Sequence, residues 1–393
     1  IGNVPHLRFP EFSGEWNKYT INDLATVVGG GTPDTTVKSY WGGDIQWFTP
    51  SEIGKNKYVD FSKRTITRDG LDNSSAKLLP LHTILLSSRA TVGECSIASN
   101  ECTTNQGFQS LIAKQCNIDF LYYLIQTKKK DLIRNACGST FLEISANEIR
   151  KIKVAVPVQN EQEQIAKLLS LIDERIATQN KIIEDLKKLK SAISQLLLFK
   201  SDLLEKRIPL SEVSALKNGY PFLSSSYDST GEYEVLTIAN VTGERYICSE
   251  GCNRILTKPS DIQFHQTLKA NDILISLTGN VGRVSLCKEG KYLLNQRVGL
   301  LQLNSAIVRE FIYQVLSSRD FEQSMISCSQ GAAQMNIGKG DVENYIIPYS
   351  GNPKNLLKIS SALNSFDTKT LTESRILQLL NRQKSHLLTS LFI

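Results

Sequence analysis

The sequence predicts a mixed α+β protein, in which two α/β domains related by a pseudo-two-fold axis are joined by two long antiparallel coiled-coil helices. Two observations support this fold class. The chain of 393 residues repeats itself with a period of about 190 residues, which indicates a domain duplication rather than a solenoid of short repeats. Each copy also ends in a long segment whose apolar residues recur every three or four positions, as on one face of a helix.

Short motifs recur in the same order in the two halves. The apolar run at residues 83–87 matches 272–276, and a Val-Gly pair follows each run. The other matched segments are Asn105-Gln106 with Asn295-Gln296, Phe120-Leu121-Tyr122 with Phe311-Ile312-Tyr313, and the Gly-led loops 138–144 and 331–337. An apolar stretch that ends in Pro157 or Pro348 follows each loop and precedes a long helical segment. We therefore expect the two halves to share one fold.

A long central helix is predicted from about Glu161 to Phe199, because its apolar stripe is sustained over about five heptads. The stripe consists of Ile165, Leu168, Leu169, Ile172, Ile176, Ile182, Ile183, Leu186, Leu189, Ile193, Leu196 and Leu197. A second helix is predicted from about Leu356 to Ile393, with the stripe Leu356, Ile359, Leu363, Phe366, Leu377, Leu380, Leu387 and Leu391. This stripe is weaker, because Thr370, Glu373 and Lys384 take inward positions, where polar residues set register at some cost in stability.

Two helices of this length in one chain are expected to pack side by side. The residues expected to form their interface are Ile165, Ile172, Ile176, Ile183, Leu186, Ile193, Leu363, Phe366, Leu377, Leu380 and Leu387. The predicted boundaries are a first domain at 1–155, a central helix at 156–200, a second domain at 201–347 and a C-terminal helix at 348–393. Within the domains we expect short strands, for example at 45–48 and 235–238, and one helical stretch each, near 118–135 and 307–326.

The composition is that of an ordinary globular protein, with 41% hydrophobic and 21% charged residues and a net charge of +6. This basic excess is compatible with a polyanionic partner but does not by itself indicate one. The eight Cys contain no C-x-x-C pair and the four His are scattered, so we expect reduced thiols and no metal site. Because neither a secretory signal nor a membrane-spanning run is found, the expected location is the cytoplasm.

Motifs for common catalytic sites are missing from the sequence. The glycine run at 29–33 lacks the G-x-G-x-x-G form of a dinucleotide loop, and neither a Walker-type phosphate loop nor a G-x-S-x-G nucleophile elbow occurs. The Asp-x-Lys sequences that a magnesium-dependent nuclease would use, at 185–187 and 367–369, fall inside the predicted helices. We therefore expect no catalytic residues, and a stand-alone modification enzyme is the weaker alternative.

Both halves carry side chains suited to DNA, because Arg can pair with guanine and Asn or Gln with adenine, whereas Lys, Ser and Thr more often hold phosphates. The candidates in the first half are Lys38, Arg64, Ser88, Arg89, Thr91, Asn105, Gln106 and Thr140. Those in the second half are Thr278, Asn280, Arg283, Asn295, Gln296, Arg297, Gln330 and Gln334. Singly these are common loop residues, so the prediction rests on the collective pattern. Arg89 aligns with Thr278, as expected if the halves read different bases.

The chain resembles the specificity subunits of Type I restriction–modification systems. Four features carry the resemblance: Pro-His-Leu-Arg-Phe-Pro-Glu-Phe-Ser-Gly-Glu-Trp at 5–16, Pro-Val-Gln-Asn-Glu-Gln-Glu-Gln-Ile-Ala at 157–166, Ile-Asp-Glu-Arg-Ile at 172–176 with its counterpart at 366–370, and the duplication itself. Together these features cover nearly the whole chain. One departure is that residues 348–353 lack the Gln-Glu-Gln run, which puts equivalent docking at the second helix in doubt.

The resemblance implies two target-recognition domains, each reading one half of a bipartite double-stranded DNA target. It also implies that the helices set the spacer and dock two methylation (M) subunits. Methyl transfer with S-adenosylmethionine would then belong to the methylation subunits, and Mg/ATP-dependent translocation and cleavage to restriction (R) subunits. This chain would bind no cofactor itself. The alternative function is a coiled-coil scaffold that binds proteins through its two duplicated modules.

Overall fold

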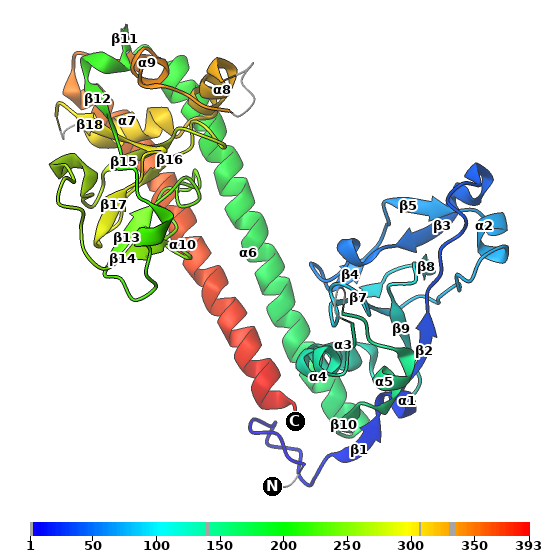
Figure 1. Ribbon diagram of the computed structural model, residues 1–393. Helices are drawn as coiled ribbons and strands as arrows, with labels where there is room; N and C mark the ends of the chain where they lie inside the picture. Colours follow the sequence, from blue (N-terminus) through cyan, green and yellow to red (C-terminus); the bar gives the residue numbers. More distant parts are fainter. Residues whose placement is uncertain (1–2, 139–141, 306–307, 330–334) are drawn as a thin grey trace. The chain divides into compact units, whose positions relative to one another are not determined.

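The structure is a computed structural model that describes residues 3–138, 142–305, 308–329 and 335–393 (Figure 1). The chain forms two compact units, the first comprising residues 1–180 and 376–393 and the second residues 181–375. The division falls within the two long helices, α6 (Gln159–Phe199) and α10 (Pro353–Leu391). Each unit therefore consists of a globular α/β part and one piece of each helix.

The first unit is built on a five-stranded sheet and a three-stranded sheet. The five-stranded sheet has the order β2 (Ala25–Gly29), β9 (Gln109–Ala113), β6 (Ile84–Leu86), β7 (Cys95–Ala98) and β4 (Tyr58–Val59). The three-stranded sheet has the order β5 (Arg64–Ile66), β3 (Trp41–Phe48) and β8 (Cys102–Thr104). A separate pair, β1 (Asn17–Thr20) with β10 (Lys153–Val156), joins the ends of the globular part. The helices are α1 (Ile21–Leu24), α2 (Arg68–Asp72), α3 (Ile118–Thr127), α4 (Lys129–Arg134) and α5 (Ala146–Lys151).

The second unit repeats this topology. Its four-stranded sheet has the order β12 (Ser214–Asn218), β18 (Val298–Leu303), β15 (Ile273–Ser276) and β16 (Val284–Leu286), which matches β2-β9-β6-β7. Its three-stranded sheet, β14 (Asn253–Ile255), β13 (Tyr233–Leu236) and β17 (Tyr292–Leu294), matches β5-β3-β8 and has the same mixture of antiparallel and parallel pairing. The strand pair β11 (Lys206–Pro209) with β19 (Ile346–Tyr349) and the helices α7 (Arg309–Leu316), α8 (Arg319–Cys328) and α9 (Lys339–Glu343) complete the unit. The predicted fold class is confirmed.

Each core is closed by pieces of both long helices. The inner strands β6 and β15 are buried at every position, because both of their faces are covered. In the first unit, Ile165 and Leu169 of α6 and Leu391 of α10 join this core. In the second unit, Leu198 of α6 and Leu363 of α10 do the same. Each globular part is therefore sealed by the start of the helix that follows it and by the end of the other helix.

The predicted helix stripes are largely confirmed. None of the expected interface residues is exposed, and Ile165, Ile172, Leu363 and Leu387 are buried. The prediction was wrong at Ile182, Leu189 and Leu196, whose relative exposures are 38%, 50% and 51%. These three lie at heptad spacing, on one row along the helix. A partner helix covers only about two rows in seven, and this row is not one of them.

Two further expectations were wrong in detail. The helical stretches expected at 118–135 and 307–326 are each two short helices, α3 with α4 and α7 with α8. In the second unit the break is set by Ser318, whose hydroxyl accepts a hydrogen bond from the amide of Phe321 and begins a new helix. The strand expected at 235–238 ends at Leu236, because the side chain of Asn240 accepts the amide hydrogen bond of Thr237 and forms a turn.

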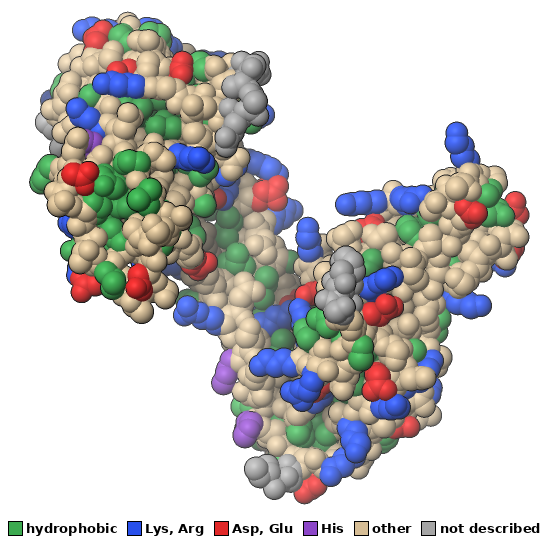
Figure 2. Space-filling model, in the orientation of Figure 1, with side chains coloured by type: hydrophobic (Ala, Val, Ile, Leu, Met, Phe, Trp, Pro, Cys, Tyr) green, Lys and Arg blue, Asp and Glu red, His purple; other side chains and the backbone are tan. Residues whose placement is uncertain are grey.

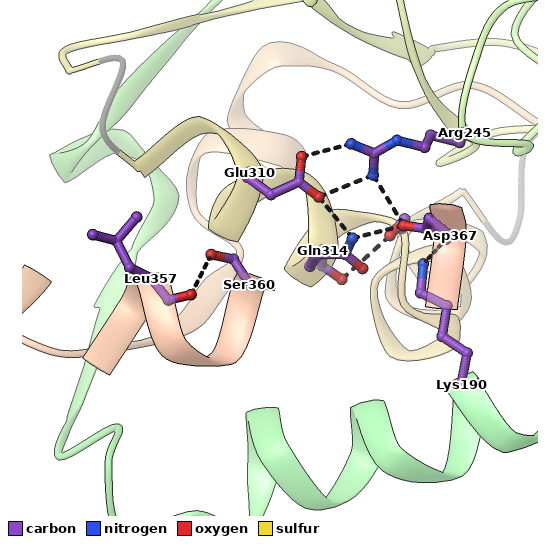
Figure 3. A network of polar contacts seen from close by, with 8 residues as sticks. Lys190, Arg245, Glu310, Gln314, Leu357, Ser360 and Asp367 are labelled. Carbon is purple, nitrogen blue, oxygen red and sulfur yellow. Dashed lines mark hydrogen bonds and ion pairs between the residues drawn. The ribbon is translucent and has the colours of Figure 1, made fainter. Parts of the chain in front are cut away.

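One aspartate in each unit ties the globular part to both long helices. In the first unit, Asp173 of α6 accepts a hydrogen bond from the hydroxyl of Tyr123 on α3 and pairs with Lys384 of α10, both at 2.7 Å. In the second unit, Asp367 of α10 accepts a hydrogen bond from Gln314 of α7 at 2.7 Å and pairs with Lys190 of α6 at 2.6 Å (Figure 3). We call Asp173 and Asp367 the anchor aspartates.

The anchor aspartates follow the pseudo-two-fold relation of the two halves. They occupy matched positions in the recurring motifs at 172–176 and 366–370. Lys190 lies as far beyond Asp173 along α6 as Lys384 lies beyond Asp367 along α10. In one ion pair the aspartate belongs to α6 and the lysine to α10, and in the other the assignment is reversed. Together the two pairs specify one antiparallel register.

Candidate nucleic-acid interface

Three segments of the first unit converge beside the end of β6. They are the loop after β6, the turn between β8 and β9, and the segment before α5. The amide of Ser88 donates to the carbonyl oxygen of Gly107 at 2.8 Å, and the carbonyl oxygen of Ser88 accepts from the amide of Ile144 at 2.9 Å. The first loop is therefore held between the other two. We call residues 87–93, 105–107 and 142–145 the first loop cluster.

The second unit has the same arrangement. The amide of Leu277 donates to the carbonyl oxygen of Arg297 at 3.0 Å, and the carbonyl oxygen of Leu277 accepts from the amide of Ile337 at 2.9 Å. We call residues 276–282, 295–297 and 335–338 the second loop cluster. The sequence alone does not bring these segments together, because the contacts join positions that lie far apart in the chain.

The two clusters agree even in an unusual backbone conformation. Ala90 and Gly279 occupy matched positions, with φ of 63° and 71°. The amide of Ala90 donates to the carbonyl oxygen of Leu142 at 3.2 Å, and that of Gly279 to the carbonyl oxygen of Met335 at 3.0 Å. The left-handed conformation is easy for glycine and costs energy for alanine. The backbone of the cluster is thus retained where the side chain is not.

A glycine at the end of β2 or β12 lets the backbone approach each cluster closely. A Cβ on Gly30 would lie 2.0 Å from the carbonyl oxygen of Asn105, and one on Gly219 would lie 2.2 Å from that of Asn295. The glycine run at 29–33 therefore has a packing role. This role was not predicted from the sequence, although Gly219 occupies the matched position in the second half and was a usable signal.

The recurring asparagines shape their own turns. The side-chain oxygen of Asn105 accepts a hydrogen bond from the amide of Gly107 at 2.9 Å, and that of Asn295 accepts from the amide of Arg297 at 3.2 Å. This turn accounts for the recurrence of asparagine in both halves. The adjacent Gln106 and Gln296 are exposed. The side-chain oxygen of Gln106 accepts a hydrogen bond from the hydroxyl of Thr32.

Charged and hydroxyl side chains surround the first cluster. Arg89 and Glu143 lie opposite each other in a backbone bridge, and their side chains pair at 3.6 Å. The hydroxyl groups of Thr91 and Ser87 are 3.0 Å apart. The hydroxyl of Ser88 is buried, and no described residue forms a hydrogen bond with it. Among the predicted residues, the structure thus brings Ser88, Arg89 and Thr91 together with Gln106.

The second cluster borders an open hollow of about 590 Å³. The polar residues that line it are Asn218, Thr278, Gln296, Arg297, Asn336 and Lys339. Thr278 and Asn336 lie opposite each other in a backbone bridge, as Arg89 and Glu143 do in the first unit. The hydroxyl oxygen of Thr278 is buried and has no hydrogen-bond partner in the part of the chain that the structure describes. Glu143, Asn336 and Lys339 were missed by sequence analysis, because only the fold places them beside the other loops.

The remaining predicted residues lie elsewhere or are engaged otherwise. Arg64 of β5 stacks on Trp41, with its guanidinium carbon 3.6 Å from the ring centroid, and Lys38 begins the short helix η1 (Lys38–Tyr40). Arg283 pairs with Glu322 at 3.7 Å, and Asn280 is exposed. Three of the predicted residues lie outside the described part of the chain, namely Thr140, Gln330 and Gln334.

The N-terminal motif and the start of α6 meet in space. The carboxylate of Glu161 is fully buried and accepts two hydrogen bonds from Arg8, each of 2.8 Å, and one from the indole of Trp16 at 3.3 Å. The side chain of Gln162 accepts a hydrogen bond from the amide of Asn117 at 3.0 Å. In the second unit Pro353 begins the helix instead, as proline can at a first helical position. Two of the sequence features behind the family resemblance therefore form one structural contact.

Four of the eight cysteines, Cys95, Cys102, Cys116 and Cys287, are buried. All eight cysteines are free, and burial raises the pKa of Cys95, Cys102, Cys116 and Cys287 to about 12, so these thiols are protonated at neutral pH. Within the described ranges, no group of three or more His, Cys, Asp or Glu is placed to hold a metal ion. A search of the same residues finds no helix with the length and apolarity to cross a membrane. Lys and Arg are scattered among Asp, Glu and uncharged residues over the visible face of each unit (Figure 2).

Curated relatives are specificity subunits of type I restriction enzymes. The MjaIX specificity subunit of Methanocaldococcus jannaschii is 39% identical over 197 residues, which cover 48% of this chain and 43% of that protein. The EcoprrI specificity subunit of Escherichia coli is 23% identical over 393 residues, covering 91% of this chain and 88% of that protein. The chain thus spans less than half the length of the first relative and most of the second.

Solved structures share the fold over the whole chain. The S subunit of a type I restriction-modification system from M. genitalium matches 99% of this chain and 99% of its own length, with a TM-score of 0.59 and 18% identity. A chain from a structure of complex assembly and conformational transition of the type I R-M system has a TM-score of 0.60 and 13% identity, covering 96% and 97%. The family of type I restriction modification DNA specificity domains matches twice, over residues 13–188 and 205–382, and the chain belongs to that family.

Proposed function

We propose that each unit reads one half of a bipartite double-stranded DNA target through its loop cluster. The observation that carries this proposal is that the two clusters have the same backbone hydrogen bonds but different polar side chains. A shared scaffold with changed side chains is what a protein needs to hold two different base sequences in equivalent positions. Arg, Asn and Gln, which read base edges in the major groove, occur in these clusters.

The long helices set the distance between the half-targets in this proposal, and they dock two methylation subunits. Support for the spacing role comes from the anchor aspartates, which specify one antiparallel register. Support for the docking role comes from the start of α6, where exposed side chains such as Gln159 and Glu163 flank the buried Glu161.

Catalysis belongs to partner subunits in this proposal. The relatives are named specificity subunits, and the assembled system would supply methyl transfer with S-adenosylmethionine and Mg/ATP-dependent cleavage from methylation and restriction subunits. This chain would bind no cofactor. A methyl-transfer assay on the purified chain alone should show no activity, and activity at a rate comparable to the full complex would contradict this part of the proposal.

Mapping of methylated bases across a genome tests the recognition role. Cells that produce the chain with its methylation subunits should methylate one bipartite motif, and deletion of this chain should remove it. Replacing residues 17–155 by those of a homologue should change one half of the motif, and replacing 205–347 should change the other half. If either replacement changed both halves, the assignment of one unit to each half-target would be wrong.

A salt titration distinguishes DNA recognition from the alternative function, a coiled-coil scaffold that binds only proteins. Binding of the assembled complex to duplex DNA should weaken steeply as salt rises, because Lys and Arg release counterions from phosphates. A scaffold that binds only proteins would show no such DNA binding at low salt.

A further inference from the structure

We infer that three matched position pairs determine the difference between the two half-targets: Arg89 with Thr278, Glu143 with Asn336, and Gly107 with Arg297. The inference rests on the proposed function, since it names the residues through which each loop cluster would read bases. It is carried by the backbone hydrogen bonds, which identify these pairs independently of a sequence alignment.

The first two pairs are joined by a backbone bridge, which occurs in both clusters. Arg89 bridges Glu143 and Thr278 bridges Asn336, so in both units the two side chains start from directly opposite backbone positions. In the first unit they form an exposed Arg–Glu pair at 3.6 Å, with relative side-chain exposures of 47% and 49%. Arg can donate to the O6 and N7 atoms of guanine, and Glu can accept from the N4 amine of cytosine. This combination suits a G·C pair.

The same two positions in the second unit have different chemistry. Asn336 is exposed beside the hollow and can bind the N6 and N7 edge of adenine. The hydroxyl of Thr278 is buried and has no hydrogen-bond partner among the described residues, and it would gain one by turning toward a base in the hollow. This combination suits an A·T pair at the place where the first unit suits G·C.

The third pair moves the arginine to another loop. At Gly107 a Cβ would meet the side-chain oxygen of Asn105 and the ring of Pro50, both at 3.0 Å, so the first cluster has little room there. The matched Arg297 is exposed and lines the hollow. Each cluster thus presents one arginine at the compared positions. In the first unit it is Arg89 of the loop after β6, and in the second unit it is Arg297 of the turn between β17 and β18. A guanine should therefore occupy different positions in the two half-targets.

Replacing residues of one cluster by their counterparts in the other tests the inference in the assembled complex with its methylation subunits. The double variant Arg89→Thr with Glu143→Asn gives the first unit the residues of the second. Methylation mapping should show a changed or relaxed base at one position of one half-target and an unchanged second half. Arg297→Gly should relax one position of the other half only.

A matched control exchanges the same residue types away from the cluster. Arg134 and Asp131 form an exposed pair on α4 of the same unit, so Arg134→Thr with Asp131→Asn removes a comparable pair. This variant should leave the motif unchanged. An unchanged motif in both Arg89→Thr/Glu143→Asn and Arg297→Gly would overturn the inference, whereas persistence of the motif after deletion of the whole chain would overturn the proposed function.

Competition binding keeps the test decisive if a variant abolishes methylation. Purified complexes are titrated with duplexes in which each base pair of the half-target is replaced in turn. For the double variant, the penalty for replacing one base pair should fall about tenfold or more, as expected on loss of a bidentate contact. If every position kept its wild-type penalty, or all penalties fell equally, these residues would not determine specificity.

Discussion

The two units keep their helix anchors and diverge in their loop clusters. Both anchors consist of an aspartate on one long helix and a lysine on the other, at the same register. In the loop clusters the backbone hydrogen bonds are kept, whereas an Arg–Glu pair is replaced by Thr and Asn. Positions that set the geometry of the helix pair thus remain alike, and the positions proposed to read DNA differ.

The anchors themselves differ in their polar surroundings. Asp173 is reached by the phenol of Tyr123, whereas Asp367 is reached by the amide of Gln314 and the guanidinium of Arg245, which also binds Glu310 (Figure 3). Burial lowers the pKa of Arg245, but its hydrogen bonds and ion pairs with Glu310 and Asp367 raise it by a larger amount. The net pKa is above its usual value, so Arg245 stays charged. The second anchor is therefore a larger charge network, which should be more sensitive to loss of its acid.

Shortening both helices should produce the largest change. Removing seven residues between Asp173 and Lys190 and seven between Asp367 and Lys384 keeps the heptad stripe and both anchors. The helices shorten by about 10 Å at about 1.5 Å per residue, or about three base pairs of DNA. Methylation mapping should show two unchanged half-targets with a spacer about three base pairs shorter.

The matched control for this change removes the same segment from α6 alone. The anchor positions would then lie closer together along α6 than along α10, so both ion pairs cannot form at once. Methylation should be lost or greatly reduced. An unchanged spacer in the paired deletion would contradict the proposed role of the helices.

Neutralising the anchor aspartate should lower the free energy of unfolding more in the second unit than in the first. Asp367→Asn leaves Lys190 without a counter-charge and Arg245 with Glu310 alone, at relative side-chain exposures of 20% and 17%, and should lower the free energy of unfolding by about 3 kcal/mol. Asp173→Asn leaves one lysine and a hydroxyl, and should cost about 1–2 kcal/mol. Denaturant unfolding of the full chain measures both.

Asp131→Asn serves as the control for the anchors, because that aspartate forms an exposed pair within one helix. It should change stability by less than about 0.5 kcal/mol. Equal losses for Asp367→Asn and Asp173→Asn would show that the extra charges of the second unit do not strengthen its anchor.

The smallest effect is expected at the left-handed position shared by the clusters. Gly279→Ala should destabilise by about 1 kcal/mol, because its φ is positive. Among the described residues an added Cβ would contact Ile238 alone, at 3.4 Å, so steric clash contributes little. Ala90→Gly should be neutral or slightly stabilising, since it removes the same strain. Thermal unfolding of the two variants checks the comparison.

Gly340→Ala is a suitable control, because its φ is not left-handed and the nearest atom to an added Cβ is 3.8 Å away. It should not destabilise the chain. A loss in Ala90→Gly as large as that in Gly279→Ala would mean that the shared conformation is not the cause.

The candidate site was only partly predictable. Arg89, Arg297 and Gln296 stood out because their residue types suit base edges. Asn105 and Asn295 stood out for the same reason, yet their side-chain oxygens hold their own turns. Glu143 and Asn336 could not be found from the sequence, because they join the site only through backbone bridges to distant loops.

The sequence by itself determined the duplication, the two long helices and the family. Repeated motifs and helical periodicity are local patterns, and they can be recognised without knowing which surfaces pack together. The tertiary structure decided which apolar residues are covered, leaving Ile182, Leu189 and Leu196 exposed. It also decided that the aspartates of two recurring motifs are anchors and that three separate loops form each cluster. Those outcomes depend on contacts between positions far apart in the chain, and such contacts exist only once the sheets and helices have packed.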